Sequence, residues 1–141
     1  MYQDKKVLVA GGTGMIGIPL VSKLIQQGAN VTVVSLDKAA YASRVLDPQA
    51  KFIQCDLTNL ENCLQVTRSQ DYVFNLVGIK GSVGIGESKA ASFLVPMLWF
   101  QTNLMEASFQ NKIRRYLFVS SICAYPQSQT PKKEESVWDG L

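Results

Sequence analysis

Short apolar runs alternate along this chain with segments in which apolar residues recur every three or four positions. The runs are rich in β-branched or aromatic residues and are too short for helices, which predicts buried strands. Five strands are expected, at residues 5–10, 31–34, 51–55, 71–77 and 115–120. The helical spacing predicts helices at residues 14–27, 38–46, 60–68 and 88–110, the last with a kink near Pro96.

Other segments follow neither pattern. Gly28 directly follows the first helical segment and predicts its end. Residues 78–87 contain four glycines and predict a loop. Everything after Ser121 is loop-like, with a polar stretch over residues 127–135. We expect one domain over residues 1–126 and a polar tail over residues 127–141 that begins a further segment.

Strands that alternate with helices predict an α/β domain. The expected architecture is a doubly wound parallel sheet of five strands, Rossmann-like, with the first strand central and helices on both faces. Ligands of such sheets bind at the carboxyl ends of the strands. In this chain that edge carries residues 11–17, Gly78 and residues 121–123.

The composition excludes several kinds of protein and site. Apolar residues make up 47% and charged residues 18% of the chain, which is globular composition. The chain has no histidine, which excludes a Ser-His-Asp triad, a Cys-His pair and a His-ligated metal, and we expect no metal site. The net charge of +3 is spread along the chain, so no nucleic-acid partner is expected.

Cysteine usage and apolar length bear on the compartment. The three cysteines form no C-x-x-C pair, which fits a reducing cytoplasm better than a disulfide framework. The densest apolar stretch, residues 93–100, is too short to span a bilayer and contains Pro96. We therefore expect a cytoplasmic protein with no membrane partner.

A glycine-rich turn joins the first strand to the first helix, with the spacing G-x-x-G-x-x-G over residues 11–17. Gly11 would allow a sharp turn, Gly14 a close approach to a diphosphate, and Gly17 close packing of the helix. Backbone amides near Met15 and Ile16 would point at the phosphates from the helix N-terminus, where the helix dipole favours anions. With Thr13, these residues are the candidate site for NAD or NADP.

A ribose-binding acid is expected about twenty residues after the last glycine, and Asp37 stands there. Ser35 occupies the end of the strand, where the acid usually lies. An acid repels the 2′-phosphate of NADP, whereas a serine does not, and Lys38 could attract it. The choice between NAD and NADP therefore stays open, as does a role for Asp37 as a solvated turn residue.

Two further strand ends supply candidate cofactor contacts. Asp56 could accept the adenine amino proton while Leu57 packs on the ring, or Asp56 could cap a turn before Thr58. Val77 and Gly78 could border the ribose on the nicotinamide side, or be the small residues that a tight strand exit requires.

Taken together, these residues resemble the extended short-chain dehydrogenase/reductase (NAD-dependent epimerase/dehydratase) family. The resemblance is carried by the three spaced glycines, by Asp56-Leu57 and by the segment Val-Ser-Ser-Ile-Cys-Ala-Tyr-Pro at residues 119–126. Within the family, that segment is most similar to the GDP-L-fucose synthases and GDP-mannose 3,5-epimerases. The resemblance implies hydride transfer between a nicotinamide and a carbon of a nucleotide sugar, with a GDP-sugar favoured as substrate.

The resemblance also implies catalytic roles. Ser121 matches the hydroxyl residue that hydrogen-bonds the reacting sugar oxygen, and Cys123 matches a cysteine acid/base beside the keto group. For Ser121 the alternative is a strand-end hydroxyl that satisfies loose backbone, and for Cys123 a small buried hydrophobe. The long helix carries Met97 where the family has an asparagine, whereas Asn103 fits a second, structural asparagine.

The family's Tyr-x-x-x-Lys pair is expected beyond Ser121 and has no match there. Tyr2-x-x-x-Lys6 fits the letters but precedes the first strand, at the wrong edge of the sheet. Three interpretations remain: the cofactor-binding part of a nucleotide-sugar epimerase or reductase, inactive alone; a stand-alone NAD(P)-binding sensor or regulatory module; or a degenerate fold kept for homo-oligomerisation.

Overall fold

A computed structural model describes residues 1–79, 89–121, 124–126 and 131–139. The glycine-rich loop predicted at residues 78–87 lies mostly outside the described residues, and so does the candidate Cys123.

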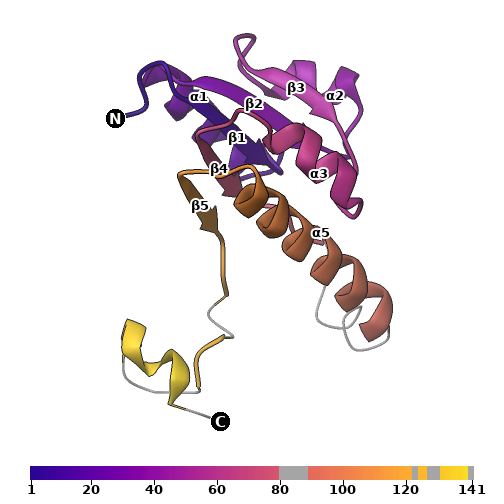
Figure 1. Cartoon of the computed structure of the whole chain (residues 1–141), viewed down its shortest axis with the longest axis vertical. Helices are drawn as coiled ribbons and strands as arrows, with labels where there is room; N and C mark the ends of the chain where they lie inside the picture. The colour runs from indigo at the N-terminus through magenta and orange to yellow at the C-terminus, as the bar shows by residue number, and fades with distance from the viewer. Residues whose placement is uncertain (80–88, 122–123, 127–130, 140–141) are drawn as a thin grey trace.

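The core of the molecule is a sheet of five parallel strands (Figure 1). The strands are β1 (Lys6–Ala10), β2 (Asn30–Ser35), β3 (Lys51–Gln54), β4 (Tyr72–Asn75) and β5 (Arg115–Phe118). Their order across the sheet is β3-β2-β1-β4-β5, and every neighbouring pair is parallel. The predicted sheet with a central first strand is therefore confirmed, and each strand boundary agrees within two residues.

Four α-helices in the described chain connect these strands: α1 (Gly17–Gln26), α2 (Ala39–Val45), α3 (Leu60–Thr67) and α5 (Ala90–Gln110). Helix α1 begins three residues later than predicted because residues 14–16 belong to the turn before it. It ends as predicted: Gly28 adopts φ +80°, its N–H donates to the Ile25 carbonyl, and the Ala29 N–H donates to the Leu24 carbonyl.

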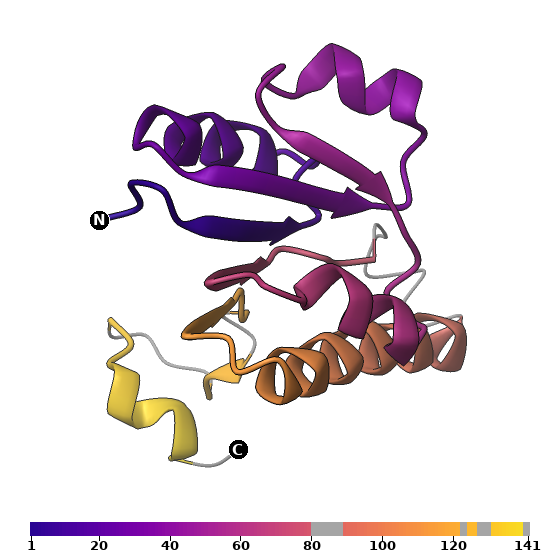
Figure 2. The same cartoon turned by 45° about the horizontal axis from the view of Figure 1, so that its top comes forward.

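Alternate side chains of β1 point to opposite faces of the sheet, and both faces are covered. Val7 and Val9 pack in a cluster with α1, whereas Leu8 and Ala10 pack in a second cluster with α3 and α5. None of these four side chains is exposed to solvent. Burial on both faces explains why the strand is an uninterrupted apolar run. Figure 2 shows α1 on one side of the sheet and α3 with the long α5 on the other.

Two asparagine side chains tie α5 to α3 and to the loop before it. Asn111 Nδ2 donates to the Leu64 carbonyl at 2.9 Å and to Thr67 Oγ1 at 2.7 Å. Asn103 Nδ2 donates to the Thr58 carbonyl at 2.8 Å, which agrees with the structural role expected for it. These bonds fix the long helix along the sheet.

The tail contains one element that the sequence analysis missed. Residues 134–138 form a short 3₁₀ helix, η2 (Glu134–Trp138), where only loop was expected. It has no buried residue, so no apolar periodicity marked it in the sequence.

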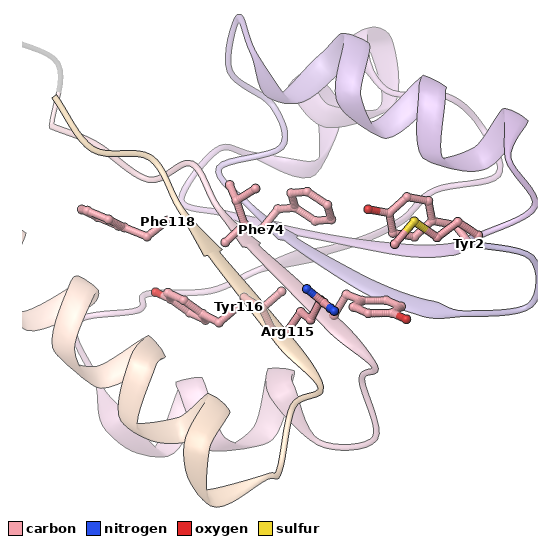
Figure 3. A pocket seen from close by; sticks show the side chains of 9 residues that line it. Tyr2, Phe74, Arg115, Tyr116 and Phe118 are labelled. Carbon is pink, nitrogen blue, oxygen red and sulfur yellow. The ribbon is translucent and has the colours of Figure 1, made fainter. Parts of the chain in front are cut away.

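The α1-side face of the sheet is covered only in part. Tyr72 and Phe74 of β4 face a hollow of about 510 Å³, which is also lined by Arg115 and Leu117 of β5 (Figure 3). Tyr2 packs into it edge-on against Tyr72, with 5.6 Å between the ring centroids. In the part of the chain that the structure describes, no helix packs over this half of the sheet.

Among the described residues, no helix combines the length and the apolar character needed to cross a bilayer.

The buried thiol of Cys63 predicts that the fold loses stability at alkaline pH. Burial, with smaller contributions from Cys55 and Asp56, raises the pKa of its thiol from 9.0 to about 12. Above pH 9.0 the unfolded state loses this proton while the folded state keeps it, so the free energy of unfolding falls as pH rises toward about 12. We expect Cys63→Ala to remove up to about 1.4 kcal/mol per pH unit of that slope.

Denaturant titrations across the alkaline range measure this slope. The same pair of proteins at neutral pH is the control, because the thiol is protonated there in both states and the two slopes must coincide. An unchanged alkaline slope in Cys63→Ala would contradict the assignment.

Candidate functional site

The turn that follows β1 adopts a conformation that favours glycine. Gly11 has φ +77°, and a Cβ there would lie 3.0 Å from the backbone carbonyl group of Leu76. The Gly11 N–H donates to the Val34 carbonyl at 2.8 Å, which anchors the turn to β2. The Gly14 N–H donates back to the Gly11 carbonyl at 3.1 Å and closes the turn. The chain thus reverses tightly at the carboxyl edge of the sheet.

Helix α1 begins in contact with this turn. A Cβ on Gly17 would lie 2.5 Å from the Gly12 Cα and 2.6 Å from the Gly11 carbonyl oxygen, too close for any side chain. The close packing expected of Gly17 is therefore made with the turn backbone. Gly12, which the sequence analysis did not single out, is also constrained, because its Cβ would lie 2.7 Å from Val33 Cγ1. Its only sequence signal is its place beside Gly11.

The first turn of α1 leaves backbone donors unused. Within the described chain, the N–H groups of Met15 and Ile16 have no hydrogen-bond acceptor, and no side chain caps the helix. The Met15 side chain is 89% exposed and Ile16 is 56% exposed. Free amides at a helix N-terminus attract anions, and the side-chain-free cradle beside them leaves room for a diphosphate. The residues present fit a dinucleotide.

The Asp37 carboxylate lies against the turn. Thr13, which is 4% exposed, donates from Oγ1 to Asp37 Oδ2 at 2.5 Å. Ser35 Oγ donates to the same oxygen at 3.2 Å and accepts from the Asp37 N–H at 2.9 Å. Oδ1 has no hydrogen-bond partner in the described chain. The predicted residues Ser35 and Asp37 thus meet the predicted turn here, through Thr13. Lys38 is exposed beside them.

At the end of β3, the Asp56 side chain caps a turn. Its Oδ1 accepts from the Thr58 N–H at 2.9 Å and from Thr58 Oγ1 at 2.8 Å, which is the alternative role considered for it. Leu57 is 5% exposed and belongs to the core cluster between the sheet and helices α3 and α5. Burial in that cluster leaves little of its side chain for contact with a ring.

At the end of β4, a buried asparagine that the sequence analysis missed organises the strand exit. Asn75, 1% exposed, donates from Nδ2 to Gln101 Oε1 and to Tyr116 Oη and accepts from the Val77 N–H at 3.1 Å. Gln101 Nε2 donates to the Val77 carbonyl at 3.2 Å. Burial raises the pKa of the Tyr116 hydroxyl, which keeps it neutral in this network. Gly78 beside it has open space where a Cβ would stand.

The remaining candidates follow β5. Ser121 is exposed, and its carbonyl accepts from the Ala124 N–H at 3.0 Å. At the opposite end of the sheet, the Tyr2 ring packs against Tyr72, which begins β4. Tyr2-x-x-x-Lys6 therefore lies away from the glycine turn.

Comparison with known proteins identifies the family. The model of the NAD dependent epimerase/dehydratase family matches residues 7–139. The chain belongs to this family, as its resemblance suggested. Membership in it supports a nicotinamide cofactor and does not distinguish NAD from NADP.

Relatives with assigned names are similar at modest identity. GDP-mannose 3,5-epimerase of Arabidopsis thaliana is 28% identical over 96% of this chain and 37% of its own length. GDP-L-fucose synthase 1 of the same plant is 25% identical over 89% of this chain and 35% of its own length. Among solved structures, UDP-N-acetylglucosamine 4-epimerase from Methanobrevibacter ruminantium, in complex with UDP-N-acetylmuramic acid, superposes with a TM-score of 0.80 at 26% identity. That match covers 95% of this chain and 44% of the other. The chain thus spans less than half the length of each of these relatives.

Two glycines allow a matched test of the turn. We expect Gly17→Ala to destabilise the fold by about 1–3 kcal/mol, because the added methyl group meets backbone atoms that cannot move aside. Gly78→Ala meets only open space and should change the stability by less than about 0.5 kcal/mol. Thermal unfolding followed by circular dichroism measures both. Equal stabilities of the two variants would contradict the close approach of α1.

Proposed function

We propose that this chain binds NAD and forms the cofactor-binding part of a nucleotide-sugar epimerase or reductase. The observation that carries the proposal is the glycine turn, where a side-chain-free cradle, unused helix amides and the Asp37 carboxylate meet at the carboxyl edge of β1 and β2. The amides of Met15 and Ile16 would hold the diphosphate, and the helix dipole would add to that attraction. In this proposal the dinucleotide-binding domain covers residues 1–126 and the tail residues 127–141.

The position of Asp37 favours NAD over NADP. Thr13 and Ser35 both bind Oδ2, which leaves Oδ1 free to accept from the hydroxyls of the adenosine ribose. A 2′-phosphate at the same place would meet a fixed negative charge. The Lys38 side chain is exposed and makes no hydrogen bond or ion pair within the described residues, so nothing directs its charge toward that place.

The proposed chemistry is hydride transfer at a sugar carbon, which the nicotinamide supplies when it is bound. The chain would position the cofactor through the glycine turn and through the strand exit at Val77. Ser121 would donate a hydrogen bond to the reacting sugar oxygen, and the Cys123 thiol would move a proton at the neighbouring carbon. Both residues follow β5, whose carboxyl end lies at the same edge of the sheet as the glycine turn.

The substrate class rests on the relatives. Two of them are named for GDP-linked sugars and one for a UDP-linked sugar, so we propose a nucleotide sugar, with a GDP-sugar favoured by the segment at residues 119–126. A cytoplasmic location remains part of the same proposal. So does the association of this chain with copies of itself.

A stand-alone NAD-binding module is the second candidate function. The observation in its favour concerns the Tyr-x-x-x-Lys pair that catalysis would need. The 141 residues contain this sequence once, from Tyr2 to Lys6, and Tyr2 packs against Tyr72 at the end of β4 opposite to the glycine turn. The third interpretation, a degenerate fold kept for self-association, predicts no cofactor binding at all. Cofactor affinity therefore separates the third interpretation from the other two, and turnover separates the first two.

We expect calorimetric titration to detect NADH binding that is at least about tenfold tighter than NADPH binding. Asp37→Asn should weaken NADH binding by about tenfold and reduce the preference for NADH, because a neutral amide oxygen accepts more weakly from the ribose hydroxyls and does not repel the 2′-phosphate. Asp47→Asn is the control, since Asp47 is an aspartate that accepts from the Gln49 N–H and follows the opposite end of α2 from Asp37.

Absence of heat with both cofactors at millimolar concentration would exclude the first two interpretations. Equal affinities for NADH and NADPH in the unchanged chain would contradict the role given to Asp37.

For turnover, we expect the 141-residue chain to bind the cofactor without converting GDP-mannose or a GDP-4-keto sugar. The reason is that the chain offers no Tyr-x-x-x-Lys pair at the carboxyl edge of its sheet. Anion-exchange chromatography of the reaction mixture measures whether the GDP-sugar is converted. Turnover that persists in Ser121→Ala would show that Ser121 does not have the role proposed here.

A further inference from the structure

Just beyond β4, side chains hold the backbone where strand pairing ends. The Leu76 N–H still donates to the Ala10 carbonyl at 2.9 Å, as a strand residue would. Val77 makes no such bond within the described chain: its N–H donates to Asn75 Oδ1 at 3.1 Å, and its carbonyl accepts from Gln101 Nε2 at 3.2 Å. Both backbone polar groups of Val77 are therefore fixed by amide side chains, one from β4 and one from α5.

Gln101 uses both ends of its amide group at this exit. Its Oε1 accepts from Asn75 Nδ2, and its Nε2 donates to the Val77 carbonyl. A glutamine that served only to complete the hydrogen bonds of the buried Asn75 would need its oxygen alone. The second bond reaches the backbone, so it also sets the direction of the chain after β4.

This bond orients the peptide unit between Val77 and Gly78. The described residues contain no cis peptide bond, and in a trans peptide the C=O and N–H groups point in opposite directions. Because the Val77 carbonyl points at Gln101 on α5, the Gly78 N–H points away from α5. That N–H has no acceptor in the described chain, Gly78 is exposed, and a Cβ there would meet no atom within 4 Å.

The strand exit that carries this free amide runs beside the glycine turn. A Cβ on Gly11 would lie 3.0 Å from the Leu76 carbonyl group and 3.1 Å from the Val77 nitrogen. Strands β1 and β4 are parallel neighbours, so their carboxyl ends lie at the same edge of the sheet. The free amides at the start of α1 and the Gly78 amide thus stand at one edge and come from two adjacent strand exits.

We infer that Gln101 is a positioning residue for the cofactor: by holding the Val77 carbonyl, it aims the Gly78 N–H at the ribose that carries the nicotinamide. The inference rests on the proposed function. There the diphosphate is assigned to the amides of α1 and the adenosine ribose to Asp37, which leaves the exit of β4 for the second ribose. A ribose oxygen can accept from the backbone N–H, and the absence of a side chain at Gly78 lets the sugar approach.

Calorimetric titration with ADP, ADP-ribose and NADH separates this role from a structural one, because ADP lacks the second ribose. We expect Gln101→Met to weaken binding of ADP-ribose and of NADH by about five- to tenfold, through the loss of one hydrogen bond, and to change ADP binding by less than about twofold. Gln101→Glu should give the same pattern, since its carboxylate can accept from Asn75 but has no N–H for the Val77 carbonyl. Gly78→Pro, which removes the donor itself, should do so too.

Gln110→Met is the matched control, because Gln110 is a glutamine of the same helix whose side chain donates only to Glu106 Oε1, at 2.7 Å. It should leave all three affinities unchanged. Circular dichroism checks that each variant is folded, and Gly78→Pro decides the matter if the Gln101 variants are not.

Two results overturn the inference while the proposed function stands. One is a folded Gln101→Met chain that binds ADP-ribose as tightly as the unchanged chain. The other is an equal loss of ADP affinity, which would mean that Gln101 supports the whole fold and not the second ribose. If the unchanged chain binds none of the three ligands, the proposed function fails and the inference fails with it.

Discussion

The contact between the start of α1 and the backbone of the glycine turn is the constraint on which the candidate site depends. No side chain separates Gly17 from Gly11 and Gly12, so the helix N-terminus stands directly at the carboxyl edge of the sheet. That position holds the unused amides of the first helical turn where an anion can reach them. It also holds Thr13 beside the end of β2, where its hydroxyl donates a hydrogen bond to the Asp37 carboxylate. The proposed diphosphate cradle and the proposed ribose-binding role of Asp37 thus both depend on one close approach.

A second constraint acts on the other half of the sheet. Asn75 is buried at the end of β4, and its single amide group joins that strand to α5 through Gln101 and to β5 through Tyr116. A buried amide with its hydrogen bonds made fixes one arrangement, because any other would leave polar groups unpaired in an apolar surrounding. The exit of the chain toward Val77 is set by the same side chain. The exits of β1 and β4 border the proposed cofactor site. The exit of β1 is fixed by close backbone packing at the glycine turn, and the exit of β4 by the hydrogen bonds of Asn75.

The local pattern of apolar residues and glycines was sufficient to predict most of the fold and part of the candidate site. The strands could be predicted because burial on both faces requires continuous apolar runs such as that of β1, and the order of the strands follows from right-handed crossovers. The turn could be predicted because glycine spacing reports backbone geometry. Whether Asp37 is a solvated turn residue could not be predicted from the sequence. This depends on the conformation of the chain after β2, where the Asp37 N–H donates to Ser35 Oγ. The hydrogen bonds of Asn75 could not be predicted from the sequence for a similar reason. Asn75, Gln101 and Tyr116 are far apart in the sequence and meet only through strand pairing and helix packing.

Gln101 occupies a special place in this arrangement. It lies at the middle of α5, and its side-chain nitrogen donates to the Val77 carbonyl at the strand exit. A shift of the helix midpoint therefore moves a hydrogen-bond donor of that exit. If a ligand bound at this strand exit favours one position of the Gln101 side chain, thermodynamic linkage requires that position of α5 to favour the ligand by the same factor.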